Sequence, residues 1–402
     1  MPTATASGSL TATIGWSEHA DAAIAGKEAA ESALKRLSSL KPRLALVFGS
    51  SWFNQAQLVQ GIRSVVGQIP LAGESTAGEI SPRGPVSRSC VVLLIASEPL
   101  VCRVGVGERV DRAPRAAGQQ AARAVLREFP GGTRAGFLLF GDGLVTGYEE
   151  AVRGIQEILG TSTPIVGGMA GDDLRFVQTY QYANHQVVSR AVVGVLLGGP
   201  VKLGVGIEHG FAPISKPRRI TRARGNILYE LDEQPAASVY EEYLGPELVQ
   251  RMRGRGLMRQ GIAYPLGIQL EETDQWLLRS VVSFGEDGSL SCSGEVLQDA
   301  WLQLMIGNRE LALEAARKAA QHAIRSLNQV GCVLVFDSAI RRTLLGSQHA
   351  ALEIARIREV IGVSTPLVGC YTYGEHAPFG ATAAYGRTAT HTGSVLVVAL
   401  GT

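Results

Sequence analysis

The sequence predicts an α/β fold of two related halves, in which mixed sheets are flanked by helices. First, a unit of strand, polar turn, helix, second strand and glycine-bounded acidic loop occurs three times. Second, the strands of this unit are continuous apolar runs, which are typical of parallel strands covered on both faces. Third, 48 of the 402 residues are glycines, and many of them occupy corresponding positions in the three units. Because they show no three-residue period, a collagen-like fold is excluded.

The elements of each unit follow one another in the same order. The first strands cover 44–48, 136–140 and 332–336, and the glycine-bounded loops cover 73–79, 167–173 and 369–375. Alanine-rich helices precede the units over 20–40, 113–129 and 310–328, and apolar strands follow them over 90–97, 191–197 and 394–400. We interpret 101–106 and 201–207 as partners, across a turn, of the strands that precede them. A repeat of this length indicates duplication of one construction.

The character of the chain changes between the second and third units. Two prolines and the basic run 218–224 predict a crossing between the halves, so we place the domains at 15–215 and 216–402. Beyond the crossing we expect a helix over 236–244 and an exposed, arginine-containing loop over 251–259. Residues 286–288, Glu-Asp-Gly, predict a hairpin turn.

Composition excludes several classes of protein. A net charge of +2 provides no overall field to attract nucleic acid or lipid. A membrane-spanning helix needs about 20 apolar residues, and no run is that long without interruption. The first ten residues lack the order of a secretory signal, so we expect a cytoplasmic protein. The 5 cysteines form no CxxC pair, which favours buried free thiols over disulfides or zinc.

The usual catalytic motifs are missing, so we expect no enzyme. No GxxxxGK[ST] motif, HExxH motif or His/Cys cluster occurs. The stretch around Ser75 resembles a nucleophile elbow, but Ala77 stands where the motif has its second glycine. Acid–base catalysis by Asp142, Glu79 and Glu375 is a lesser alternative, for which no positioned nucleophile can be named.

The acidic glycine loops are the candidate binding elements. Their glycines permit close approach of the backbone to a ligand. The carboxylates at the ends of parallel strands lie where open α/β sheets bind small molecules. Those of Glu79, Asp172, Asp173 and Glu375 could accept hydrogen bonds from an amine. The alternative is that each carboxylate caps a helix or satisfies the N–H groups of its own loop.

The same loops carry a family resemblance. Residues 74–80, Glu-Ser-Thr-Ala-Gly-Glu-Ile, resemble the N-terminal half of the FIST sensory family, and residues 366–375 resemble the signature of its C-terminal half. Residues 167–173 and 226–244 fit the pattern as well, and the resemblance extends from about Gly15 to Leu400.

The resemblance implies a ligand-sensing module of bacterial signal transduction. The suggested ligands are amino acids, and the implied partners are a histidine kinase, a cyclic-dinucleotide enzyme or a chemotaxis receptor. Both halves fill the chain, so we expect the output to lie on a separate protein. No cofactor is expected. The ligand's ammonium would meet Glu79 or Glu375, and its carboxylate would meet Arg341 or Arg279. The predicted site residues are Ser75, Glu79, Asp142, Asp172, Asp173, Arg279, Arg341, Tyr373 and Glu375.

Two departures from the family pattern limit what carries over. Ser338 replaces a cysteine that the family often has three residues before an arginine, which excludes thiol chemistry there and leaves Arg341. Cys370 stands where an aromatic residue is common.

One branch of the family resembles haem-based nitric-oxide sensors that regulate histidine kinases. Haem b is therefore the alternative cofactor, with His209 as its candidate axial ligand. In that branch an aromatic residue directly follows the histidine, whereas here Gly210 comes before Phe211.

Overall fold

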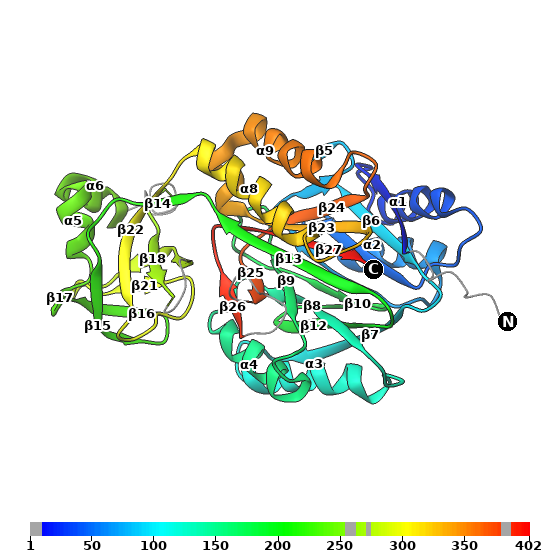
Figure 1. The fold of residues 1–402 in the computed structure, drawn as a ribbon, viewed down its shortest axis with the longest axis horizontal. Coiled ribbons are helices and arrows are strands. Elements are labelled where there is room, and N and C mark those ends of the chain that lie inside the picture. The colour runs from blue at the N-terminus through cyan, green and yellow to red at the C-terminus, as the bar shows by residue number, and fades with distance from the viewer. Residues whose placement is uncertain (1–9, 254–262, 271–274, 379–386) are drawn as a thin grey trace.

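The chain folds into two lobes that are joined at two adjacent crossings (Figure 1). The structure is a computed structural model and describes residues 10–253, 263–270, 275–378 and 387–402. The large lobe holds the three repeated units, and the small lobe is formed by residues 211–307, which are inserted into the third unit. The crossings are the turns at Gly210 and at Asn308.

Each unit of the large lobe has the same succession of elements. The first contains β1 (Thr11–Ser17), α1 (Ala22–Leu37), β2 (Leu44–Ser50), α2 (Gln55–Val66), β3 (Leu71–Thr76), β4 (Glu79–Ser81), β5 (Gly84–Val86) and β6 (Cys90–Ala96). The second contains β7 (Val101–Glu108), α3 (Pro114–Arg127), β8 (Arg134–Asp142), α4 (Tyr148–Leu159), β9 (Ile165–Ala170), β10 (Gln181–Ala183), β11 (Gln186–Val188) and β12 (Ala191–Gly198). The third contains β13 (Lys202–His209), α8 (Arg309–Ile324), β23 (Val330–Ser338), α9 (Ala339–Ile361), β24 (Leu367–Thr372), β25 (Glu375–Pro378), β26 (Thr388–His391) and β27 (Ser394–Gly401).

The helix boundaries follow from local hydrogen bonding. Asp21, Asn54 and Asn308 precede helices, and their side chains accept hydrogen bonds from the backbone N–H three residues on. Such caps satisfy N–H groups that the first turn of a helix leaves without partners. Helices α2, α4 and α9 each end at a glycine, which is the usual terminator. The three predicted alanine-rich helices are confirmed as α1, α3 and α8.

The three units form three six-stranded mixed sheets with a common strand order. The orders are β1-β6-β2-β3-β10-β11, β7-β12-β8-β9-β25-β26 and β13-β27-β23-β24-β4-β5. In each sheet the two strands that flank the second helix of the unit are parallel, and the other pairs are antiparallel. The last two strands of each sheet are a hairpin that belongs to a different unit. The units therefore exchange hairpins in a cycle, and none of them completes its sheet alone.

One prediction about strand pairing is wrong. Residues 101–106 and 201–207 form strands, but neither pairs with the strand before it. β7 pairs with β12, and β13 pairs with β27. Strand β6 already has β1 and β2 on its two edges, so β7 has no free edge to join there. Each strand instead begins the sheet of the next unit.

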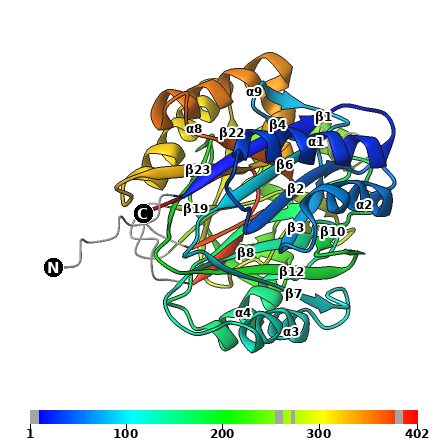
Figure 2. The same cartoon turned by 90° about the vertical axis from the view of Figure 1, so that its right-hand side faces the viewer.

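The inner faces of the three sheets meet in one hydrophobic core. Alternate residues of each first strand point inward, so Leu46 and Phe48 lie in this core while Ala45 and Val47 contact α1 and α2. Phe48, Phe140 and Phe336 occupy corresponding positions, and their ring centroids lie 6.0–6.4 Å apart. The rings form a nearly equilateral triangle, as expected at the centre of a threefold repeat. Figure 2 shows the helix pairs on the outer faces of the sheets.

A glycine in the second strand of each unit allows the parallel strands to approach closely. A Cβ atom on Gly73, Gly167 or Gly369 would lie 1.9 Å from a backbone oxygen of the neighbouring first strand. That distance is far inside van der Waals contact, and backbone atoms in a packed sheet have little room to move. The repeated glycines of these loops are therefore required first by strand packing.

We expect Gly167→Ala to lower the free energy of unfolding by about 2 kcal/mol, because the added methyl group forces the two strands apart. Gly147→Ala is the matched control. Gly147 also has a positive φ, 75°, but no atom lies within 4 Å of its added Cβ. This control should lose only about 1 kcal/mol through backbone strain. Chemical denaturation measures both, and equal losses would contradict the close-approach explanation.

The small lobe is a separate sheet with its own core. It contains β14 (Phe211–Pro213), β15 (Arg218–Arg224), β16 (Ile227–Leu231), β17 (Gln234–Pro235), α5 (Ser238–Leu244), α6 (Pro246–Arg251), β18 (Leu266–Gln269), β19 (Trp276–Arg279), β20 (Val281–Phe284), β21 (Leu290–Cys292) and β22 (Trp301–Gly307). The predicted helix and hairpin are confirmed as α5 and the β20–β21 pair. The basic run 218–224 is strand β15 rather than an irregular linker. Most of 251–259 lies outside the described residues.

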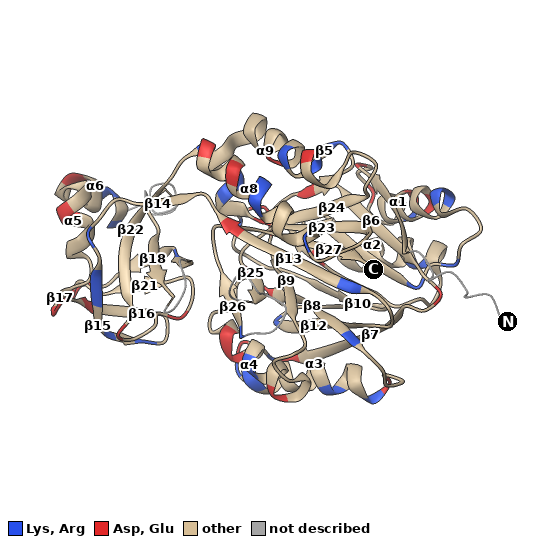
Figure 3. Cartoon of the chain, in the orientation of Figure 1, with Lys and Arg blue, Asp and Glu red and all other residues tan. Residues whose placement is uncertain are grey.

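The predicted α/β class with mixed sheets and flanking helices is confirmed. All five cysteines are buried free thiols, as predicted. The boundary near 215 stays a prediction, but hydrogen-bonded strand pairs cross it at β13–β27, β24–β4 and β25–β9. Figure 3 shows charged residues mainly on the helices and on the small lobe, while the central strands carry few.

Candidate functional site

The exchange of hairpins brings the three acidic loops together. The Ser75 hydroxyl donates to the carbonyl of Gly171 over 2.8 Å, which joins the first loop to the second. The Tyr373 hydroxyl donates to a carboxylate oxygen of Asp172 over 2.6 Å, which joins the third loop to the second. The loops thus contact one another, and their polar groups are partners across units.

Glu79 and Glu375 are fully buried and hold equivalent hydrogen bonds. Glu79 accepts from the Thr76 hydroxyl over 2.5 Å and from the backbone N–H and hydroxyl of Ser89. Glu375 accepts from the Thr372 hydroxyl over 2.8 Å and from the N–H of Ser394 over 3.3 Å. Burial raises the pKa of Glu79 to about 7 and the pKa of Glu375 to about 8, because low polarity disfavours the charged form.

The acidic residues of the second loop also serve the loop itself. Asp172 accepts from the backbone N–H groups of residues 176, 177 and 178. Asp173 accepts from the hydroxyls of Ser50 and Ser51, each over 3.2 Å. Burial raises the pKa of Asp173 above its ordinary value. These bonds fit the alternative given above, in which the carboxylates satisfy donors of the protein itself and not those of a ligand.

Asp142 has a similar role at the end of β8. Its carboxylate accepts from the N–H groups of Leu144 and Arg190 and from the Thr179 hydroxyl, which lies 2.7 Å away. With Glu79 and Glu375 fully buried, the three carboxylates offer no exposed acid–base pair. The geometry therefore lends no support to acid–base catalysis by these residues.

Arg341 is neutralised inside the protein. Its Nε donates to Asp337 over 2.9 Å, another nitrogen pairs with Glu353, and all three residues are fully buried. The guanidinium also donates to the carbonyl of Ala312. The predicted contact of Arg341 with a ligand carboxylate has no access from solvent in this arrangement, because two buried carboxylates already occupy the cation.

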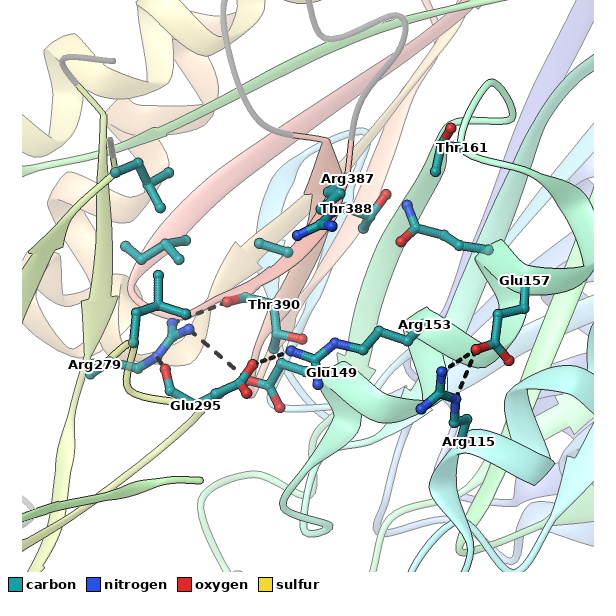
Figure 4. Close-up of a pocket in the computed structure, with 15 residues that line it drawn as sticks. Arg115, Glu149, Arg153, Glu157, Thr161, Arg279, Glu295, Arg387, Thr388 and Thr390 are labelled. Atoms are coloured by element: carbon teal, nitrogen blue, oxygen red, sulfur yellow. Dashed lines mark hydrogen bonds and ion pairs between the residues drawn. The ribbon is translucent and has the colours of Figure 1, made fainter. Parts of the chain in front are cut away.

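Arg279 is a predicted site residue that borders an open cleft. The cleft has a volume of about 550 Å³ and lies between the lobes. Strand β19 and residues 295–297 of the small lobe form one wall, and α3, α4 and β26 of the large lobe form the other (Figure 4). This volume is in the range of pockets that bind small molecules.

The guanidinium of Arg279 is held rigidly at the wall. Its Nε donates to the carbonyl of Glu295 over 2.7 Å, and one terminal nitrogen donates to the carbonyls of Leu278 and Thr390. The other terminal nitrogen lies 4.0 Å from Glu149 at the start of α4. Burial lowers the pKa of Arg279, but not enough to discharge an arginine at neutral pH.

The cleft has more positive than negative charge. Its lining contains the ion pairs Arg115–Glu157 and Arg153–Glu295 beside Arg279 and Glu149. Arg387, immediately before β26, also lines it and has no ion-pair partner within the described ranges. With four arginines against three glutamates, the lining has one positive charge in excess. Such a site favours a ligand that carries a carboxylate.

Sequence reasoning identified Arg279 but missed the rest of this lining. Arg387 stands alone in a stretch of small residues, with no local pattern that points to a site. The mixed charges of α4, at residues 149, 150, 153 and 157, are a signal that was available, since they mark one polar face of that helix. Only the folded chain brings that face opposite β19.

His209 ends β13 and is partly buried. Its Nδ1 accepts a hydrogen bond from the N–H of Phe211 over 3.3 Å. Burial and the nearby Arg341 cation lower the pKa of His209 to about 4, so the ring is neutral and able to bind a metal. The interlobe cleft is not lined by His209. Haem binding stays a prediction.

Two sequence families match the chain. The pattern of the FIST N domain matches residues 43–234, and the pattern of the FIST C domain matches residues 236–378. Together they cover most of the chain. Both the interlobe cleft and the acidic loops draw residues from the two matched segments.

Relatives among curated proteins are similar over part of their length. An uncharacterised protein of Methanocaldococcus jannaschii is 27% identical over 281 residues, which cover 65% of this chain and 53% of that protein. An uncharacterised protein of Mycobacterium tuberculosis is 27% identical over 235 residues, covering 56% of this chain and 60% of that protein. The matches thus span little more than half of these relatives.

The solved structures that match this chain are only weakly similar to it. A cyanuric acid hydrolase is 9% identical, with a TM-score of 0.32 and coverage of 98% of this chain and 99% of that one. The cyanuric acid hydrolase of A. caulinodans is 11% identical, with a TM-score of 0.34 and coverage of 97% and 98%. Scores this low carry no weight for fold or activity.

No helix in the described parts of the chain is long and apolar enough to cross a membrane.

Proposed function

The chain belongs to the family of FIST N and FIST C domain proteins, and on that premise we propose that it is a non-enzymatic sensor of a small carboxylate-bearing metabolite. FIST domains are sensory domains of signal transduction. An amino acid is the first candidate ligand, and the interlobe cleft is its site. The observation that carries the proposal is the cleft of about 550 Å³ with the exposed Arg387 on its wall.

The ligand's carboxylate would meet Arg387. Arg279 lies on the same cleft, but carbonyl oxygens already occupy most of its donors. Arg387 is exposed, and its guanidinium has five donors in a planar fork that fits a carboxylate. A charge-assisted pair of this kind is about twice as strong as a neutral hydrogen bond.

The ligand's ammonium would meet Glu149 or Glu157. Glu149 is 12% exposed, and its Oε1 lies 4.0 Å from Arg279 and accepts a hydrogen bond from the N–H of Glu295 over 2.9 Å, so Oε2 would take the ammonium. Leu270, Leu277 and Leu297 add apolar surface for the ligand's side chain. Cationic, anionic and apolar groups around one small cleft match the three parts of an amino acid. In this proposal Glu149 and Glu157, which line the cleft, take the place of the buried Glu79 and Glu375 as partners of the ammonium.

Binding would act on the angle between the lobes. The walls come from different lobes, and the chain crosses between the lobes near residues 210 and 308, so a ligand that bridges the walls would favour a closed arrangement. We propose that closure is read by a separate signalling protein such as a histidine kinase, a cyclic-dinucleotide enzyme or a chemotaxis receptor.

A thermal-shift screen of the amino acids and common carboxylate metabolites tests the proposal. A ligand at about 100 times its Kd adds about 2.7 kcal/mol of stability, which raises the melting temperature by several degrees. We expect at least one compound to do so with the unmodified protein and to fail with Arg387→Gln.

The matched control is Arg317→Gln, which removes an exposed arginine on α8 far from the cleft lining. It should keep the full shift. A flat response of the folded protein to the whole set would overturn the proposed ligand class, and an undiminished shift in Arg387→Gln would overturn the proposed site.

A further inference from the structure

An exposed apolar surface lies beside the second acidic loop. Trp52, Leu174, Phe176 and Val177, which we call the Trp52 patch, are 54%, 43%, 46% and 75% exposed. Clusters of large exposed apolar side chains mark interaction sites more often than isolated ones do. Neither the cleft nor the core uses these side chains.

Arg175 links Trp52 to the loop that carries the other members of the patch. The guanidinium of Arg175 lies 4.5 Å from the centre of the Trp52 ring and donates to the hydroxyl of Ser51. The Phe176 ring stacks on Tyr373 at a centroid distance of 5.0 Å. Loop 172–178 is therefore fixed against the ends of two units, with its apolar side chains facing outward.

The backbone of this loop is held in an unfavourable conformation. Asp173, Leu174 and Phe176 have φ values of 57°, 60° and 54°, in the left-handed region that non-glycine residues avoid. Each such residue costs on the order of 1 kcal/mol, and the Leu and Phe side chains, which stay 43% and 46% exposed, recover only part of their burial energy. The three N–H groups bound by Asp172 keep the loop in this form. Strain of this kind concentrates at recognition sites.

The surroundings of the patch are basic. Arg88 and Arg175 both lie over the Trp52 ring, at 4.8 Å and 4.5 Å. Arg83 and Arg342 line an adjoining hollow of about 670 Å³, which Leu174 also borders. The acidic groups at this hollow are Glu18 and Asp173, and the Asp173 carboxylate is turned toward Ser50 and Ser51. Arginine and tryptophan are the residues most enriched where binding energy is concentrated.

We infer that the Trp52 patch docks a polypeptide segment of a separate protein in which large apolar side chains alternate with Asp or Glu. The apolar side chains would cover Trp52, Leu174 and Phe176, and the acidic ones would pair with Arg83, Arg88 and Arg175; Arg342 adds positive charge, but its donors are occupied by Ala77, Val86 and Ser87. The basic excess selects this occupant over a neutral one. The inference rests on the proposal that the chain signals to another protein, but the patch and the cleft share no residue.

Binding of synthetic peptides tests this surface. The probes are peptides in which Leu or Phe alternates with Glu, and the two controls replace Glu with Lys or the apolar residues with Ser. We expect the acidic apolar peptides to bind at least about ten-fold tighter than either control, which corresponds to about 1.4 kcal/mol. Trp52→Ala and Arg175→Gln should each remove this preference.

Val282→Ser is the matched control, since Val282 is 59% exposed but lies on β20 of the small lobe. Its affinity should be unchanged, and the melting temperatures of all variants report whether they fold. Equal binding of the acidic and basic peptides, or full affinity in Trp52→Ala, would overturn the inference. Concentration-dependent dimerisation lost in Trp52→Ala would show a second copy as the occupant and would also overturn it. Since the amino-acid response of the cleft is measured separately, failure here leaves the ligand proposal intact.

Discussion

Arg341→Met is expected to lower the free energy of unfolding by about 3–5 kcal/mol. The variant removes the only cation that the structure places against the buried carboxyls of Asp337 and Glu353 in the described chain. The pKa of Asp337 is raised well above its ordinary value by burial and by the neighbouring Glu353, which shows how poorly this site tolerates negative charge. Without Arg341, the second carboxyl must also become neutral or remain charged in an apolar environment.

Chemical denaturation of Arg341→Met measures the loss. The control is Arg356→Met on the same helix, whose pair with Glu359 is about half exposed and contributes little. Adding Glu353→Gln to Arg341→Met should recover part of the loss, because it removes the charge that the first change leaves unpaired. A loss below about 1 kcal/mol in Arg341→Met would show that the cation is not needed for the fold.

The second large effect is on pH dependence above neutrality. We expect the free energy of unfolding to fall by about 2 kcal/mol between pH 6.5 and pH 8. Glu375, with a pKa of about 8, and Glu79, with a pKa of about 7, hold protons in the folded protein that the unfolded chain has already released. A raised carboxyl pKa makes the folded state bind more protons, so stability is lost as the pH rises through it.

The buried histidines have the opposite pH dependence, so the effect of the carboxyls is to be measured above pH 6.5. Burial lowers the pKa of His376 and His391 to about 3, so these rings stay neutral in the folded protein. Acidification below about pH 6.5 destabilises the protein, because the unfolded chain binds protons that the buried rings cannot. At pH 6.5 about half of these rings in the unfolded chain still hold a proton, so between pH 6.5 and 7.5 they offset the carboxyl effect by about 0.4 kcal/mol each, and above pH 7.5 they contribute little slope. The descent from pH 6.5 to 8 therefore belongs to the buried carboxyls.

Glu375→Gln isolates the larger of the two contributions. The amide has the shape of the protonated carboxyl but cannot ionise, so the part of the fall in stability between pH 6.5 and 8 that Glu375 causes should disappear. Unfolding by denaturant at three pH values measures the slope, and Glu150→Gln, at an exposed ion pair, is the control. A slope in Glu375→Gln as steep as in the unmodified protein would contradict the assignment.

Local patterns predicted most of the elements but not their assembly. The caps, terminating glycines and apolar runs define α1, β2 and their counterparts in the other units, because each depends on neighbouring residues. The exchange of hairpins depends on which sheet edges are free. Short strands such as β4 and β25 carry no local sequence signal for the sheet that they join. The same is true of β7 and β13, which were therefore predicted to pair with the wrong strands.

The candidate site, like the fold, could be predicted from the sequence only in part. The acidic loops were located from sequence, and the structure brings them together. Their burial could not be predicted, since exposed and buried carboxylates share the same local pattern. Glu79 and Glu375 begin β4 and β25, the strands that add to the sheets of other units. Arg279 was named for its charge alone, and its place on the cleft depends on the insertion of the small lobe. Arg387 became visible only through that cleft.

The most direct test of the account is a calorimetric titration of the amino acid or carboxylate that most raises the melting temperature. Three proteins are compared: the unmodified chain, Arg387→Gln in the interlobe cleft, and Arg83→Gln at the hollow beside the acidic loops. Loss of a charge-assisted hydrogen bond costs about 1.5–3 kcal/mol, so Arg387→Gln should weaken binding by about ten-fold or more, while Arg83→Gln should bind as the unmodified chain does. Full affinity in Arg387→Gln together with weakened binding in Arg83→Gln would place the ligand at the loops and contradict the account.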